Sequence, residues 1–98
     1  MLNYLLDLDI TPEEIYEINN SLSSNIISSL ELSKGVVIET LTYYKELGVK
    51  YLSNIIINRP DLVLIKKEDI EQSISKLDKD VIVNIINNDI EDLILFGI

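Results

Sequence analysis

The sequence predicts an all-α fold, a small array of two or three helical hairpin repeats with five to seven short helices. Apolar residues recur mainly three and four positions apart, the spacing that places them on one face of an α-helix. A central stretch returns about thirty residues later, a period typical of a supersecondary unit used more than once. In this repeat, Leu47 returns as Leu77, residues 54–56 return as 84–86, and residues 61–62 return as 92–93.

The length and composition fit one helical domain that spans residues 1–98. The chain has 98 residues, of which 47% are apolar, and this fraction lies at the upper end of the globular range. Isoleucine, leucine and valine occur throughout the sequence, so we expect a packed core rather than disorder.

The clearest helix start lies at Thr11. Its hydroxyl can accept a hydrogen bond from the first turn, Pro12 suits the first helical position, and Glu14 can complete a capping box. The apolar residues that follow fall on one face: Ile15, Ile18 and Leu22. Three serines, at positions 21, 23 and 24, then separate this helix from a short helical segment over residues 26–30.

The remaining helices are predicted from the same apolar spacing and from signals at their ends. They cover residues 36–47, 51–58, 66–77 and 78–86, and a short apolar segment follows at 93–96. Gly48 can adopt the left-handed conformation that ends many helices, and Asp78 can cap the last helix. The helix over 51–58 should stop before Pro60, because the residue ahead of a proline disfavours the α conformation.

A mixed α+β fold is the alternative, because several segments are rich in β-branched residues that also suit strands. These segments are residues 36–38, 55–57, 62–65 and 81–83. Two observations favour helices. Asparagines interrupt the runs at helical rather than alternating spacing, and the Asn-Gly or Asp-Gly pairs that mark tight hairpins are absent from the sequence.

The sequence contains no cysteine and no histidine. Disulfides, thiolate nucleophiles, the usual zinc ligands and the commonest general base near neutral pH are therefore excluded. The three glycines are isolated, so no glycine-rich phosphate loop is present. We predict a protein that is not an enzyme, that holds no cofactor or metal, and that works in the reducing cytoplasm. No run of about eighteen apolar residues occurs, so we expect no membrane partner.

Two acidic ends flank a nearly neutral middle. The net charge is −9; residues 1–33 hold six acids and no base, and residues 77–98 hold five acids and one lysine. These acids either keep the protein soluble or form a face for a basic partner. Nucleic acid is not the expected partner, because phosphate binding requires clustered lysine and arginine.

Six residues are the candidates for contact with a partner protein: Tyr43, Tyr44, Tyr51, Arg59, Lys66 and Lys67. Tyrosine and arginine are typical interface anchors, and the tyrosines gather around the Gly48 turn. The alternative for the tyrosines is core packing with the hydroxyls at the rim. The two lysines begin a helix, where the helix dipole disfavours cations. They suit either an acidic partner or the acidic ends of this chain.

Residues 47–49 read Leu-Gly-Val after a predicted helix, and residues 60–62 read Pro-Asp-Leu at the end of the same unit. This pattern resembles the helical repeat of the mitochondrial transcription termination factor family. Two further stretches are similar to the turn, with an aspartate in place of the glycine: residues 5–15 with Asp9, and residues 74–93 with Asp78 and without the proline. The resemblance implies a curved stack of helical hairpins that binds nucleic acid along a basic concave face. The acidic composition departs from the family on this last point.

We therefore expect a non-catalytic helical module that binds another protein or associates with itself. Open-ended helical stacks leave exposed end faces, and residues 93–98 are the predicted one. One alternative is a nucleic-acid-binding repeat protein that uses Lys45, Lys50, Arg59, Lys66 and Lys67. Another is an acidic inhibitor that occupies the basic groove of a nucleic-acid-binding protein. The sign of the net charge favours the inhibitor over the nucleic-acid binder.

Overall fold

The computed structural model describes residues 2–98 and confirms the all-α fold, with no strand in that range. The α-helices are α1 (Pro12–Ser21), α2 (Ser24–Leu32), α3 (Lys34–Leu47), α4 (Leu52–Asn58), α5 (Lys67–Ser75) and α6 (Lys79–Asn88). Three 3₁₀-helices accompany them: η1 (Asn3–Leu8), η2 (Pro60–Leu62) and η3 (Ile90–Phe96). The β-branched runs at 55–57 and 81–83 lie inside α4 and α6, so the mixed α+β alternative is wrong for the described residues.

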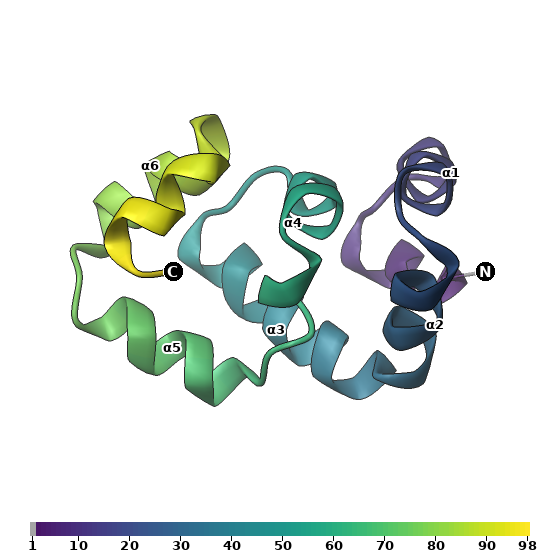
Figure 1. Ribbon diagram of the computed structural model, residues 1–98, viewed down its shortest axis with the longest axis horizontal. Helices are drawn as coiled ribbons and strands as arrows, with labels where there is room; N and C mark the ends of the chain where they lie inside the picture. Colours follow the sequence, from purple (N-terminus) through teal and green to yellow (C-terminus); the bar gives the residue numbers. More distant parts are fainter. Residues whose placement is uncertain (1) are drawn as a thin grey trace.

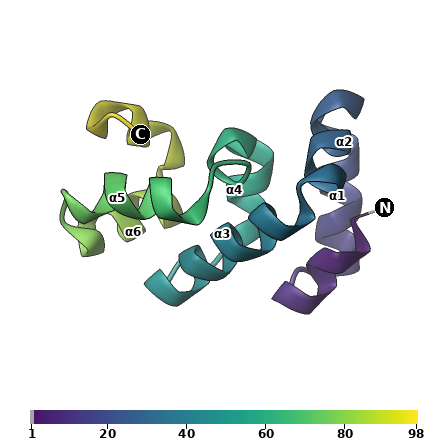
Figure 2. The ribbon, with the colours of Figure 1, turned by 90° about the horizontal axis from the view of Figure 1, so that it is seen from below.

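The elements form two rows in an array that measures 35 × 24 × 22 Å (Figure 1). In one row, α3 packs between η1 and α5; in the other, α4 packs between α1 and η3, which itself packs on α6. Helix α2 packs on α3 at the N-terminal end. Figure 2 shows α1 and α2 at one end of the array and the C-terminal segment, with α5 and α6, at the other. The two ends of the array are therefore open.

The start of α1 has the capping box that the sequence predicts. The backbone N–H of Glu14 donates to the Thr11 hydroxyl at 3.1 Å, and the backbone N–H of Thr11 donates to the Glu14 carboxylate at 2.9 Å. Pro12 occupies the first turn, and Ile15 and Ile18 are buried. Local signals thus place this helix against the core.

The sequence repeat corresponds to a structural repeat. Residues 54–56 lie in α4 and residues 84–86 lie in α6, each in the second helix of a unit that ends in a 3₁₀-helix. Even a local side-chain bond recurs. The Asn58 amide donates to the Asn54 carbonyl, and the Asn88 amide donates to the Asn84 carbonyl, both at 2.9 Å. The two units thus share their order of elements and this side-chain hydrogen bond.

Three turns share one left-handed closing geometry. Asp9, Gly48 and Gly97 all have positive φ. At each turn, the N–H of this residue and that of the next residue donate back to carbonyls three and five positions earlier, the pattern of a Schellman cap. Asp9 thus stands in the place of a glycine, as its position in the sequence predicts.

The same expectation fails at Asp78. Its φ is −72°, and its carboxylate accepts hydrogen bonds from the backbone N–H groups of Asp80 and Val81. Asp78 therefore starts α6 as the predicted cap and does not end α5 as a glycine substitute. Helix α5 already ends at Ser75, and this leaves a turn of a different shape.

Candidate protein-binding surface

Two of the predicted contact residues lie in the core. Tyr43 and Tyr44 of α3 are buried, with their ring centroids 5.9 Å apart. The Tyr44 hydroxyl donates to the carbonyl oxygen of Leu62 at 2.7 Å, and burial raises the pKa of this phenol. Burial, with a contribution from Glu71, also raises the pKa of Tyr43. Both side chains thus pack in the core, as the alternative predicts, but their hydroxyls are buried and do not lie at the rim.

The other four candidates lie at the two ends of α4 and at the start of α5. Tyr51 precedes α4 and is 56% exposed. Arg59 donates to both carboxylate oxygens of Asp61 and, at 2.6 Å, to the carbonyl oxygen of Ile98. Lys66 is the exposed cap residue of α5, and half-buried Lys67 begins that helix. Lys67 lines a shallow pocket that also contains three glutamates: Glu39, Glu46 and Glu68. Partner contact at the six residues stays a prediction.

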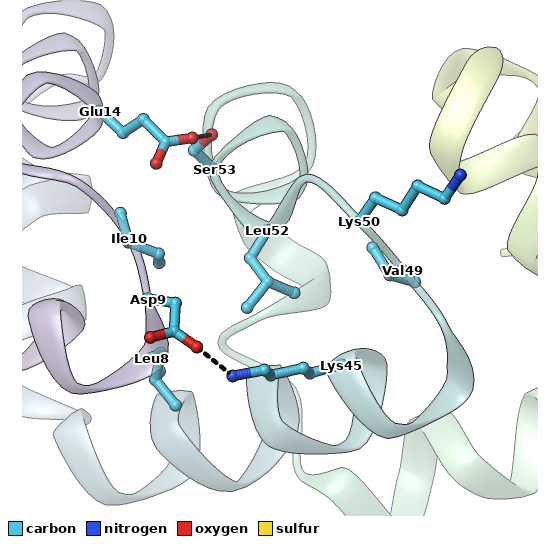
Figure 3. A pocket seen from close by; sticks show the side chains of 9 residues that line it. All are labelled: Leu8, Asp9, Ile10, Glu14, Lys45, Val49, Lys50, Leu52 and Ser53. Atoms are coloured by element: carbon cyan, nitrogen blue, oxygen red, sulfur yellow. Dashed lines mark hydrogen bonds and ion pairs between the residues drawn. The ribbon is translucent and has the colours of Figure 1, made fainter.

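A small polar pocket, here named the seam pocket, lies where the first two units meet (Figure 3). Its lining residues are Leu8, Asp9, Ile10, Glu14, Lys45, Val49, Lys50, Leu52 and Ser53. Lys45 of α3 forms an ion pair with Asp9, and the Ser53 hydroxyl of α4 donates to the Glu14 carboxylate at 2.7 Å. Its volume of ≈ 120 Å³ is small beside the roughly 300–1,000 Å³ of ligand pockets. We interpret the seam pocket as a junction between units.

The two carboxylates of the seam pocket have pKa values that are lowered by their hydrogen-bond partners. The hydrogen bond from Lys45 holds the pKa of Asp9 below its ordinary value. Hydrogen bonds from the Thr11 backbone and from the Ser53 hydroxyl lower the pKa of Glu14. Glu14 therefore serves two purposes, because it caps α1 and also ties this helix to α4.

Replacing Glu14 by alanine is expected to lower the free energy of unfolding by about 1 kcal/mol at neutral pH. Because the folded protein lowers the pKa of Glu14, its contribution is present above the ordinary glutamate pKa of about 4.3 and is lost as the pH falls through the lowered value. Urea denaturation followed by circular dichroism should show the difference at neutral pH and a smaller difference near pH 3.

The matched control for Glu14 is Glu17→Ala on the exposed side of the same helix. Glu17 makes no side-chain hydrogen bond within the described residues, so we expect a change within about 0.5 kcal/mol. A loss for Glu14→Ala that is the same at both pH values would contradict the assigned role of its ionised carboxylate.

Contacts between units were not identified from the sequence. Besides the bond between Glu14 and Ser53, the Asn87 side chain of α6 accepts from the backbone N–H of Lys50 at 2.9 Å and donates to the carbonyl of Gly48 at 3.4 Å. The sequence did contain a signal for the bond between Glu14 and Ser53. Aligning Asp9 with Gly48 also aligns Glu14 with Ser53, because both pairs are 39 positions apart.

The last 3₁₀-helix carries a row of exposed apolar side chains, here named the C-terminal ridge: Ile94, Leu95 and Phe96. They are 70%, 80% and 40% exposed, whereas Leu93 is buried. The other large apolar side chains exposed in residues 2–98 are not adjacent to one another in sequence: Leu6, Tyr16, Leu32, Tyr51 and Val81. The predicted end face over 93–98 is thus divided between core and surface.

An apolar groove follows the ridge directly and is here named the C-terminal groove. It has a volume of ≈ 580 Å³ and is lined mainly by apolar residues: Leu62, Leu64, Ile65, Ile70, Gly97 and Ile98, with Asp61 and Ser73. The bond from Arg59 to the Ile98 carbonyl ties the last residue to the unit that contains η2. Gly97 and Ile98, which follow the ridge in the chain, thus connect it to the groove.

Comparisons with known proteins found no matching family model, curated protein or solved structure. Among residues 2–98, no helix is both long and apolar enough to cross a membrane. In the same range, no group of three or more acidic side chains is arranged to hold a metal ion.

Proposed function

We propose that this chain is a non-catalytic helical module that binds another protein molecule, either a different chain or a second copy, through the C-terminal ridge and groove. The observation that carries the proposal is the exposure of three consecutive large apolar side chains, Ile94, Leu95 and Phe96. Covering a side chain of this size stabilises a complex by about 1.5–3 kcal/mol. Large apolar side chains that are exposed next to one another in the chain, rather than scattered singly, indicate an interaction site.

The pairing of two of the five basic side chains considered for nucleic acid supports a protein partner over nucleic acid. Lys45 is ion-paired with Asp9, and Arg59 is ion-paired with Asp61. Binding along a phosphate backbone requires several lysine or arginine side chains that are free to displace the counterions of the phosphates. The lack of cysteine supports a cytoplasmic setting for the interaction.

The test is affinity capture from a native lysate with three forms of the protein. The ridge variant is Ile94→Ser with Leu95→Ser, and the matched control is Tyr16→Ser with Leu32→Ser, which removes two exposed apolar side chains at the other end. We expect the ridge variant to lose its captured protein at least tenfold by quantitative mass spectrometry, whereas the control retains it. Sedimentation of the same three forms at two protein concentrations shows whether the chain associates with a second copy of itself. Equal capture and equal sedimentation by all three forms would overturn the proposal.

A further inference from the structure

The ridge residues are aligned with carboxylates one helical turn earlier. In a 3₁₀-helix there are three residues per turn, so side chains three positions apart lie on one edge. Glu91 and Ile94 therefore share one edge of η3, and Asp92 and Leu95 share a second. The third edge consists of Ile90, Leu93 and Phe96, and the first two of these are buried. The exposed surface of η3 thus has acids at its start and apolar side chains at its end.

Acids outnumber bases in the last part of the chain, where Lys79 is the one base close to these acids in the sequence. Residues 80–98 contain four acids and no lysine or arginine: Asp80, Asp89, Glu91 and Asp92 are the acids. All four are exposed, and α6, which carries Asp80, packs against η3. The acid that lines the groove, Asp61, is paired with Arg59. The ridge is therefore an apolar surface with a negative border.

A second copy of this chain is a poor match for such a surface. At the opposite end of the array, residues 1–33 carry six acids, of which Asp9 is paired with Lys45 and Glu14 lies in the seam pocket. The other four outnumber the one base at this end, Lys34, which lies over the Tyr4 ring. Both end faces are thus acidic, and stacking either of them on the ridge would bring like charges together, which opposes association. A partner with apolar side chains next to lysine or arginine would gain both burial and charge pairing.

We infer that the ridge binds a basic amphipathic helix of another protein. This inference rests on the proposed function and adds the chemistry of the partner. The apolar stripe of such a helix would cover Ile94 and Leu95, while cations one turn away would face Glu91 and Asp92. Helix-in-groove recognition uses anchors at positions i, i+3, i+4 and i+7. Because the acids are exposed, their contribution should weaken as salt is added.

The test uses three fluorescein-labelled synthetic helices. The first has leucine at i, i+3, i+4 and i+7 with lysine at the other positions. The second keeps the leucines and replaces lysine by glutamine, and the third has the first composition in scrambled order. Fluorescence anisotropy at low and physiological salt should show the lysine helix binding at least tenfold more tightly than the glutamine and scrambled helices. The difference between the lysine and glutamine helices should shrink at the higher salt concentration.

Two pairs of variants separate the apolar and the charged contributions. The ridge variant Ile94→Ser with Leu95→Ser should weaken the lysine helix at least tenfold, and Glu91→Gln with Asp92→Asn should remove the preference for lysine over glutamine. The first control is Tyr16→Ser with Leu32→Ser, and the charge control is Asp7→Asn with Glu17→Gln; all four positions are exposed at the other end. Both controls should bind as the unmodified protein does.

The outcomes distinguish this inference from the proposed function. If the lysine and glutamine helices bind equally and the ridge variant weakens both, the ridge is an interaction surface, as the proposed function states, but its partner need not be basic and the inference is wrong. Equal binding of the scrambled helix would overturn recognition of an amphipathic stripe. A dimer in sedimentation that the ridge variant abolishes would identify a second copy as the occupant and also overturn the inference. Binding that the ridge variant leaves unchanged would count against the surface itself.

Discussion

Replacing Leu41 by alanine is expected to lower the free energy of unfolding by about 2–5 kcal/mol. Leu41 lies in α3 and has no exposed surface. This helix packs against η1, α2, α4 and α5, so it touches elements of every unit. Truncation removes buried methyl groups and leaves a cavity that rigid neighbours on several sides cannot refill. The loss is a large part of the roughly 5–15 kcal/mol that stabilises a typical domain.

Leu32→Ala is the matched control for this prediction, because the chemical change is the same and Leu32 of α2 is 87% exposed. We expect its effect to stay within about 0.5 kcal/mol. Urea denaturation of both variants should show a lower midpoint for Leu41→Ala with an unchanged slope. Similar midpoints for the two variants would mean that α3 is not the packed centre of the array.

Local signals were sufficient to predict the helices but not their contacts. The capping box of Thr11 and Glu14 depends on residues three positions apart, and the sequence states it directly. The bond between Glu14 and Ser53 depends on how α1 lies on α4, and no local pattern specifies that arrangement. A structural repeat supplies the missing information, since equivalent positions in successive units meet at the same seam.

Helix boundaries and burial show the same limit. Residues 33–35 read as a break between helices, yet α3 begins at Lys34 and runs through Gly35. The cost of a glycine inside a helix is only about 1 kcal/mol, and the packing of α3 exceeds it. For Tyr43 and Tyr44, helical spacing predicts the side of the helix on which each ring lies. It does not predict whether the ring is in the core or at its rim, because tyrosine suits both positions.

The end face over 93–98 was predicted as one exposed stretch, and the structure divides it. Leu93 is buried, whereas Ile94 and Leu95 are largely exposed. The reason is the three-residue period of η3, which puts Ile90 and Leu93 on the same inward edge. The sequence has apolar residues at all these positions and gives no sign that the last element is a 3₁₀-helix rather than an α-helix. The sequence therefore located the candidate surface at the end of the chain, and only the fold showed which of its side chains are exposed.

Replacing Gly48 by alanine is expected to lower the free energy of unfolding by about 1–2 kcal/mol, through the backbone alone. Gly48 ends α3 with a φ of 108°, a conformation that L side chains rarely adopt. Space is not the obstacle, because an added Cβ would lie 3.7 Å from the nearest side-chain atom, Cγ1 of Val83. The turn is also held by the Asn87 amide, which donates to the Gly48 carbonyl, so any relaxation would disturb the contact between units.

Gly35→Ala is the control for Gly48→Ala, and its effect should have the opposite sign. Gly35 lies in α3, and an added Cβ there would meet nothing within 4 Å. Alanine loses less conformational freedom than glycine on entering a helix, so this variant should be more stable by about 0.5–1 kcal/mol. Thermal and urea denaturation of both variants measure the two shifts. Both substitutions add the same atoms. Destabilisation by both would therefore mean that the added methyl group disturbs packing, and it would contradict the role of the left-handed turn at Gly48.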